Sequence, residues 1–307
     1  MSSPPIPKRV FAVSDTHLNL QLIFDVKNGR NHKKPATVPE KKQFLLKTRD
    51  MAVYGWENYI KKLKKSWDTS ITQNDIVLVS GDVAMSTRNP LLDLKFLSER
   101  PGFKIIGCGN HDMWWPYSTS QKRNYQLKYK NMFFLDSTNY YKDENILVVG
   151  TKLADYRFNL WPAYSDTFEE EMYDPKIEDH RCENETHNLE IVLNTLSKHR
   201  GSLKTILMIH HPPCDQNITQ NEILEMIVQA QPDYCIFGHV HSFTQLYKDP
   251  KIQTIEDVKT RAPAVNFIRG QTQFNCVALD YLKNQPMLLF SIQQYFPFLG
   301  ITKNGFI

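Results

Sequence analysis

The chain has 307 residues, of which 41% are hydrophobic and 23% are charged, and its formal net charge is +4. A chain of this length can bury a large core, because the buried fraction of a protein's surface rises with size. The mild and dispersed positive charge argues against a nucleic-acid partner. No apolar stretch approaches the roughly 20 residues that a membrane span needs, so no membrane segment is expected.

The five cysteines are spread through the chain without a CxxC pair. They are Cys108, Cys182, Cys214, Cys235 and Cys276. An odd number at wide spacing favours a reducing compartment and argues against a disulfide framework. The segment Met1–Pro5 also lacks the charged and apolar regions of a secretory signal. We therefore expect a cytoplasmic protein.

Short, unbroken apolar runs predict strands that are buried on both faces, as in sheets covered by helices. In chain order these strands are Val10–Val13, Ile76–Val79, Lys104–Ile106, Thr205–Ile209 and Tyr234–Phe237. After His241 the sequence changes to short β-rich segments separated by turn residues. Those segments are Phe243–Tyr247, Ala264–Ile268, Phe274–Leu279 and Met287–Ile292. We expect them to form antiparallel strands that complete a second sheet.

Helical patterns lie between the predicted strands. Apolar residues in 43–67 follow a 3-4-3-4 spacing, which places them on one stripe of a helix. They are Val53, Trp56, Ile60, Leu63 and Trp67. Asn89-Pro90 indicates a helix start with proline at the first helical position. A further helix is predicted over Asn188–His199, and Thr219–Glu222 fits a capping box for the next one.

Two long connections stand out, at 18–40 and 152–183. The first is polar and rich in Lys and Asn, and the second is aromatic, acidic and irregular. Loops of this length inside a compact domain are usually functional or disordered. We expect a single domain over residues 1–307 with these two loop insertions, because the polar motifs described next span Asp15 to His241.

A short polar motif follows each of the five strands predicted before residue 241. The motifs are Asp15-Thr16-His17, Gly81-Asp82, Gly109-Asn110-His111-Asp112, His210-His211-Pro212 and Gly238-His239-Val240-His241. In open α/β sheets, ligands bind beyond the carboxyl ends of the strands, so the motifs are expected to meet at one edge of one sheet. Carboxylate and amide oxygens together with imidazoles suit a pair of divalent metals such as Mn, Fe or Zn.

Taken together and in this order, the five motifs resemble those of the calcineurin-like metallophosphoesterase superfamily, from about Lys8 to Gln245. The resemblance implies an α/β fold of the α+β four-layer type, with two packed mixed β-sheets flanked by helices. It also implies a metal site at the carboxyl ends of the strands. The Ser/Thr protein phosphatase branch is disfavoured, because that branch has Gly-Asn-His-Glu where this chain has Gly109–Asp112.

The resemblance further implies which residues bind the two metals. Asp15, His17 and His241 would bind the first ion, and Asp82 would bridge both. Asn110, His210 and His239 would complete the second. The chemistry agrees, since a carboxylate has two oxygens and can bridge, whereas an Asn carbonyl is a neutral ligand. Pro212 favours His210 over its neighbour His211, because the family pattern is His-x-Pro.

The same resemblance implies two catalytic residues. His111 stands where the family places a group beside the leaving oxygen, so it is the predicted general acid. Asp112 is expected to orient His111 and to favour its protonated form.

Six further residues are candidates for contact with the substrate: Arg88, Trp114, Trp115, Tyr156, Arg157 and His211. Arg88 is a cation shortly after Asp82, where it would meet phosphate charge. Trp114 and Trp115 either form a wall of the pocket or pack in the core. The aromatic loop that holds Tyr156, Arg157 and Trp161 either lines the pocket or packs on itself.

These features predict a phosphoric ester hydrolase with two metals and a metal-activated hydroxide. The substrate is expected to be a small phosphodiester, a nucleotide or a phosphomonoester, and the moderate cationic density leans toward a diester or nucleotide. Two alternatives stay open: a catalytically silent scaffold of the same fold, and a nuclease. No oligomeric state is predicted.

Overall fold

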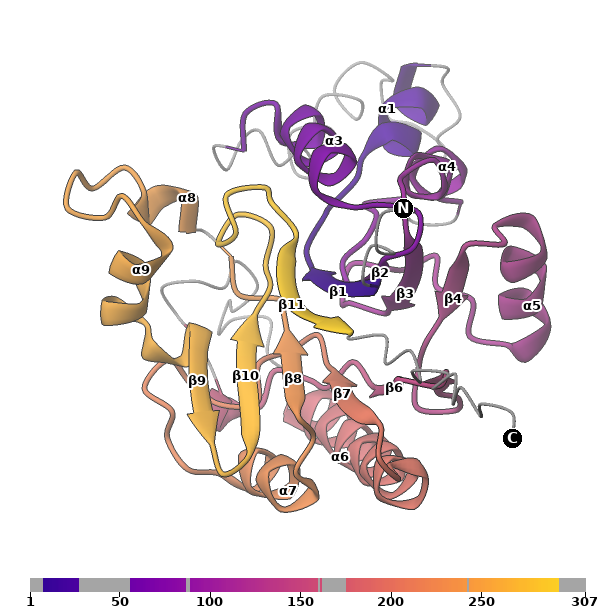
Figure 1. Ribbon diagram of the computed structural model, residues 1–307. Helices are drawn as coiled ribbons and strands as arrows, with labels where there is room; N and C mark the ends of the chain where they lie inside the picture. The colour runs from indigo at the N-terminus through magenta and orange to yellow at the C-terminus, as the bar shows by residue number, and fades with distance from the viewer. Residues whose placement is uncertain are drawn as a thin grey trace, which may run out of the picture.

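The computed structural model describes residues 8–27, 56–86, 89–159, 161, 175–241 and 243–292. Two β-sheets lie next to each other, with helices on their outer sides (Figure 1). The predicted fold class, α/β with two packed mixed sheets flanked by helices, is confirmed.

The first sheet has five strands in the order β11-β1-β2-β3-β4. The strands are β1 (Lys8–Val13), β2 (Ile76–Ser80), β3 (Phe103–Gly107), β4 (Met132–Phe134) and β11 (Met287–Ile292). The first four run parallel, and β11 pairs antiparallel with β1. The helices around this sheet are α1 (Leu20–Lys27), α3 (Tyr59–Ser70), α4 (Leu91–Ser98) and α5 (Thr119–Lys128) (Figure 1).

The second sheet has six strands in the order β5-β6-β7-β8-β10-β9. They are β5 (Tyr141–Lys142), β6 (Ile146–Gly150), β7 (Lys204–Met208), β8 (Tyr234–Phe237), β9 (Asn266–Arg269) and β10 (Thr272–Cys276). The four inner strands run parallel, and the edge strands β5 and β9 run antiparallel to their neighbours. Helices α6 (Pro175–His199) and α7 (Glu222–Ala230) lie along its outer side (Figure 1).

The remaining elements are short. They are η2 (Arg157–Asn159), α8 (Phe243–Leu246), α9 (Ile255–Arg261) and η4 (Pro263–Val265). Among the helices that the structure describes, none combines the length and the apolar character of a membrane span.

Alternating side chains of the first sheet enter two different cores. In β1, Val10 and Ala12 pack between the sheets, whereas Phe11 and Val13 pack beneath the helices. The period of two is that of any strand, because successive side chains point to opposite faces. Both faces are apolar here, which explains why the strand reads in the sequence as an unbroken apolar run.

The segments after His241 differ from the prediction in two places. Residues Phe243–Leu246 form helix α8 and not a strand. Strand β11 joins the first sheet beside β1 and does not complete the second. A short β-rich run does not specify its partner, because any open strand edge satisfies the same backbone hydrogen bonds. The segments near 264–268 and 274–279 do supply strands β9 and β10 of the second sheet.

Both predicted loop insertions contain helix. Helix α1 occupies Leu20–Lys27, and α6 begins at Pro175, well before the predicted start at Asn188. Most described side chains over 179–187 are exposed, so this part of α6 has no apolar stripe that a periodicity search would find. The rest of the two insertions, 28–40 and 162–174, lies outside the described residues.

The other helix predictions are largely confirmed. Trp56, Leu63 and Trp67 are buried, although α3 begins only at Tyr59 and residues 43–55 lie outside the described range. Pro90 is the N-cap of α4 and not its first helical residue. Asn221, and not Thr219, caps α7, because its side chain accepts the Leu224 amide.

Leu63 provides a test of the packing of α3 against the first sheet. Its side chain is fully buried in the helix-facing core. We expect Leu63→Ala to lower the free energy of unfolding by about 2–5 kcal/mol, through lost apolar contact and a residual cavity. Urea titration measures the loss. Lys61→Ala, on the exposed side of the same helix, should change stability by less than about 0.5 kcal/mol, and equal losses in both variants would contradict the packing.

Candidate metal centre

The polar motifs meet at the carboxyl ends of strands from both sheets. The first three follow β1, β2 and β3, and the last two follow β7 and β8. The predicted convergence on one edge of a single sheet is therefore wrong in detail, because the five strands divide between two sheets. The convergence itself is real: the His239 amide donates to Asp15 (3.1 Å), and His210 Nε2 lies 3.3 Å from Asp82 Oδ2.

The backbone turns sharply where these motifs leave their strands. Asp15, His17, Asp82 and His239 have positive φ angles of 54°, 39°, 49° and 67°. This left-handed region is unfavourable for side chains other than glycine, and such strain concentrates at functional sites. The neighbouring Gly109 is required for space, since a Cβ there would lie 2.0 Å from Asp82 Oδ1.

A first group of ligand atoms comes from Asp15, His17 and His241. One atom of each lies within 4.8 Å of the others, and all three side chains are buried. His17 Nε2 is 3.9 Å from Asp15 Oδ1 and 3.8 Å from Asp82 Oδ2. The Trp56 ring covers this group, with its centroid 5.8 Å from that of His17 and 6.0 Å from that of His241.

A second group surrounds Asn110. Its Oδ1 lies 2.8 Å from His210 Nε2 and 3.1 Å from His239 Nδ1. Asp82 borders both groups, because its Oδ2 lies within 3.8 Å of His17 Nε2 and 3.3 Å of His210 Nε2. The structure thus brings all seven predicted ligands close together, and groups among them could hold a metal ion.

The hydrogen-bonding roles of His210 indicate a cation. Its Nδ1 is 2.9 Å from the Ser80 carbonyl oxygen, which can only accept, so Nδ1 carries the proton. In the neutral ring the Nε2 lone pair then faces the carboxylate of Asp82 and the amide oxygen of Asn110. These three acceptors need a positive charge between them, and in the metal-free site the proton of His210 supplies it, where a metal ion would take its place.

Two buried atoms of the site strengthen this conclusion. His17 Nε2 and Asp82 Oδ2 have no hydrogen-bond partner among the described residues. A buried polar atom without a partner costs free energy, and a buried carboxylate oxygen costs more. A divalent ion would satisfy both atoms, so the residues present fit a metal pair.

The electrostatics couple Asp82 to His210. Burial works against ionisation of both, yet the nearby imidazole of His210 holds the pKa of Asp82 well below its usual range. In turn Asp82 raises the pKa of His210 to about 9 against the effect of burial. Burial also raises the pKa of Asp15 to about 6, with Asp82 adding to the shift and His210 opposing it. The metal-free site therefore holds a proton where an ion would bind.

Asp112 does not have the predicted contact with His111. Its Oδ1 accepts from the Val83 amide (2.9 Å) and from Trp114 Nε1 (3.0 Å), and its Oδ2 accepts from the Gly109 amide (2.9 Å). The carboxylate thus ties the turn after β2 to the turn after β3. The expectation that it orients His111 is corrected, because its oxygens are used by backbone amides and an indole.

His111 lies beside the first group of ligands. Its amide donates to Asp82 Oδ1 (2.8 Å), and its ring centroid is 5.4 Å from that of His17. The side chain is half-buried, so one side of it reaches solvent. This position suits a proton donor at the mouth of the site, and its catalytic role stays a prediction.

The predicted substrate contacts lie in different places. Trp114 and Trp115 are buried and pack against Phe134, so core packing accounts for both. Trp115 also borders a cavity of about 190 Å³ at the carboxyl ends of β3, β6 and β7, next to His210. Arg88 lies outside the described residues.

The aromatic segment after β6 lines a second hollow, of about 530 Å³, beside α6. Tyr156 is buried with its hydroxyl on Thr186 (3.0 Å), whereas Arg157 is exposed. Trp161 is buried, and its Nε1 donates to the Cys214 carbonyl (2.7 Å). Tyr156 and Trp161 therefore pack as structural residues, and Arg157 lies at the outer rim of this hollow.

Sequence reasoning missed Asp155. Its Oδ1 lies 3.0 Å from His211 Nδ1 and 2.8 Å from His239 Nε2. Although burial opposes ionisation, these two histidines hold the pKa of Asp155 below its usual range. The feature of the sequence that could have revealed Asp155 is the apolar run Ile146–Gly150. This run forms β6, and Asp155 follows it at the carboxyl end of the strand, where the other motifs lie. This run was not among the predicted strands.

A fold of two mixed sheets with clustered Asp, Asn and His at strand ends defines a class of metal-dependent phosphoesterases. A model of the calcineurin-like phosphoesterase family matches residues 8–243, and the chain belongs to that family. This match confirms the family that the five motifs predicted.

Individual relatives are distant. The chain is 37% identical to the Gene 66 protein of Mycobacterium phage L5 over 57 residues, which is 18% of this chain and 28% of that protein. Among solved structures it is similar to a phosphopantetheinyl hydrolase of Mycobacterium tuberculosis, with 14% identity, coverage of 95% and 99%, and a TM-score of 0.45. A Thermus thermophilus protein gives 13% identity, coverage of 92% and 98%, and a TM-score of 0.45. Nothing about activity follows from likenesses this loose.

The proton on His210 gives a pH dependence of metal binding. Its pKa, raised to about 9, keeps the metal-free ring protonated at lower pH, so an ion must displace that proton. We expect Mn²⁺ affinity to rise by up to about tenfold per pH unit as the pH increases toward 9, and then to level off. Calorimetric titrations in two buffers of different ionisation enthalpy count the released protons. Affinity that is independent of pH would contradict the shift.

Proposed function

We propose that the chain is a phosphoric ester hydrolase that uses two divalent metal ions, with Mn, Fe or Zn as the candidates. The observation that carries the proposal is the convergence of ligand atoms on Asp82, whose Oδ2 lies 3.8 Å from His17 Nε2 and 3.3 Å from His210 Nε2, with Asn110 Oδ1 2.8 Å from the same His210 nitrogen. Family membership supports the hydrolase class. Bound ions would lower the pKa of a water and neutralise charge on the phosphoryl group.

The chain's own residues supply the rest of the chemistry. Asp15, His17 and His241 would hold one ion, Asn110, His210 and His239 the other, and Asp82 both. Their strained turns and buried partners fix these side chains before substrate arrives, which reduces the reorganisation needed at the moment of reaction. His111 would keep a proton at the solvent side of the site and pass it to the departing alcohol oxygen.

The substrate that we propose is a small phosphodiester, a nucleotide or a phosphomonoester. Arg157 at the rim and Lys152 beside the cavity next to His210 are the cations of the described residues that line the two hollows. A monoester at neutral pH carries more charge than a diester and needs more positive charge around it. This modest cationic lining supports a diester.

The five cysteines are all free, which supports a cytoplasmic location.

Asp82→Asn tests the proposal. Replacing the shared carboxylate removes one charge and one anionic oxygen, so at least one ion should be lost and turnover should fall by more than about 1000-fold, equivalent to at least ~4 kcal/mol. Metal content is measured by mass spectrometry, and turnover with bis- and mono-nitrophenyl phosphate plus Mn²⁺. The ratio of the two substrates also decides between diester and monoester.

Asp68→Asn is the matched control, because Asp68 lies on α3 and pairs with Lys64 and Arg100. It should keep its metals and its rate. Normal metal content and turnover in Asp82→Asn would refute the shared-carboxylate site. A wild-type protein that binds no Mn²⁺ and hydrolyses neither ester would instead favour a scaffold, and cleavage of DNA alone would favour a nuclease.

His111→Ala separates the proton donor from the metal ligands. We expect both ions to remain, with a rate loss of about 10²–10⁴-fold on esters of poor leaving groups and a much smaller loss on nitrophenyl esters. Rates with alkyl and nitrophenyl esters measure the difference. His180→Ala, at an exposed histidine on α6 that lines neither hollow, should change neither rate. Equal losses on good and poor leaving groups would remove His111 from the role of acid.

A further inference from the structure

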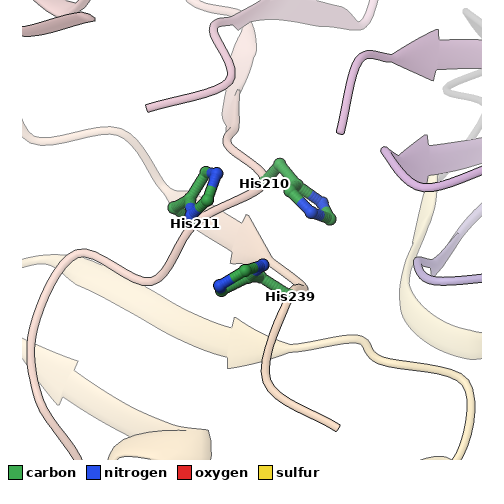
Figure 2. A group of neighbouring side chains, drawn as sticks. All are labelled: His210, His211 and His239. Carbon is green, nitrogen blue, oxygen red and sulfur yellow. The ribbon is translucent and has the colours of Figure 1, made fainter. Parts of the chain in front are cut away.

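Asp155 reaches the metal centre from a strand that carries none of the five motifs. It follows β6, and its Oδ1 contacts His211 Nδ1 (3.0 Å) and His239 Nε2 (2.8 Å). The rings of His211 and His239 lie side by side, with centroids 4.1 Å apart, and His210 turns to the other side (Figure 2). The two histidines of the His210-His211 pair therefore face different neighbours.

His239 presents one nitrogen to each neighbour. Its Nδ1 lies 3.1 Å from Asn110 Oδ1, inside the second ligand group, and its Nε2 lies toward Asp155. An ionised carboxylate can only accept, so a ring that pairs with Asp155 carries its proton on Nε2. The lone pair is then on Nδ1, the atom that faces the second ion.

Asp155 also lies beside a nitrogen atom of His239 whose hydrogen bonding is incomplete. His239 Nε2 is buried and has no aligned hydrogen bond within the described part of the chain. It lies 2.8 Å from Asp155 Oδ1, a distance at which a proton on Nε2 can pair with that oxygen.

His211 anchors the carboxylate in this position. Its Nδ1 bonds Asp155 Oδ1, and its amide donates to the Lys152 carbonyl (3.0 Å). The turn after β7 and the turn after β6 are thereby joined at two points. Asp155 is held even though about a third of its side chain reaches solvent (35%).

We propose that Asp155 is a positioning residue that selects the tautomer and the orientation of His239 for the second metal ion, with His211 as its anchor. Carboxylates that accept from a ligating histidine typically increase metal affinity by about 10- to 100-fold. This inference rests on the proposed two-ion centre, but it does not depend on turnover or on the identity of the substrate.

The test is the binding of Mn²⁺ to the metal-free full-length chain, measured by calorimetry, with metal content by mass spectrometry. Asp155→Asn keeps the size of the side chain and removes its charge. We expect one of two ions to bind about 10- to 100-fold more weakly and the other to be unchanged. Asp155→Glu, which restores a carboxylate, should recover part of the affinity, and His211→Ala should weaken the same ion by a smaller factor.

Asp249→Asn is the matched control. Asp249 has similar side-chain exposure (32%), and it bonds Arg261 and the Lys251 amide in place of histidines. It should leave both affinities unchanged. Because Asp155 also contacts His211 in the metal-free protein, affinities are compared at a temperature at which both metal-free chains are fully folded, so that weaker binding of one ion reports the positioning role.

Three results would overturn the proposal. The first is unchanged affinity for both ions in Asp155→Asn. The second is equal weakening of both ions together with a lower melting temperature, which would indicate a purely structural contact. The third is a wild-type content of three ions that falls to two in Asp155→Asn and in His211→Ala, which would place a separate cation among Asp155, His211 and His239. A chain that binds two ions as expected yet hydrolyses no ester would refute the proposed function and leave this inference intact.

Discussion

The structure depends on one buried carboxylate, that of Asp82, and on the space kept free around it. Its Oδ2 faces His17 Nε2 from the first sheet and His210 Nε2 from the second, and a side chain at Gly109 would collide with its Oδ1. An ionised carboxylate at this depth is unstable alone, because burial removes the water that would solvate it. In the metal-free protein the imidazole of His210 compensates that charge, and bound metal ions would take over this role. The strained turns at Asp15, Asp82 and His239 are consistent with a backbone shaped to meet this requirement.

Sequence was a good guide to the strands that are buried on both faces. The predicted runs at 76–79 and 234–237 match β2 and β8 closely, because an apolar run bounded by polar residues leaves little choice of length. The partner of β11 could not be predicted, since strand pairing depends on which edge is free in three dimensions. Helix α8 was misread because its few residues include Phe243, which is buried and equally typical of a strand.

The candidate site, like the fold, could be predicted from the sequence only in part. The seven predicted ligands come together, because each motif directly follows a strand and the strand fixes where it points. Two aspartates, Asp112 and Asp155, make contacts that the sequence did not predict. The contacts of Asp112 run to backbone amides that no motif reveals, and Asp155 is separated from its strand by several residues. The contacts of Asp112 therefore left no local pattern, whereas the apolar run Ile146–Gly150 did mark the strand that precedes Asp155.

The pairing of β1 with β11 has a consequence for how the molecule is made. The strand that bears Asp15 and His17 at its end lies between β2 and the last strand that the structure describes. On the ribosome β1 therefore emerges long before its partner on one side exists. Contacts between such distant segments slow folding, because the chain must first close a very long loop. The first sheet is thus expected to stay open at the β11 edge of β1 until β11 has been made.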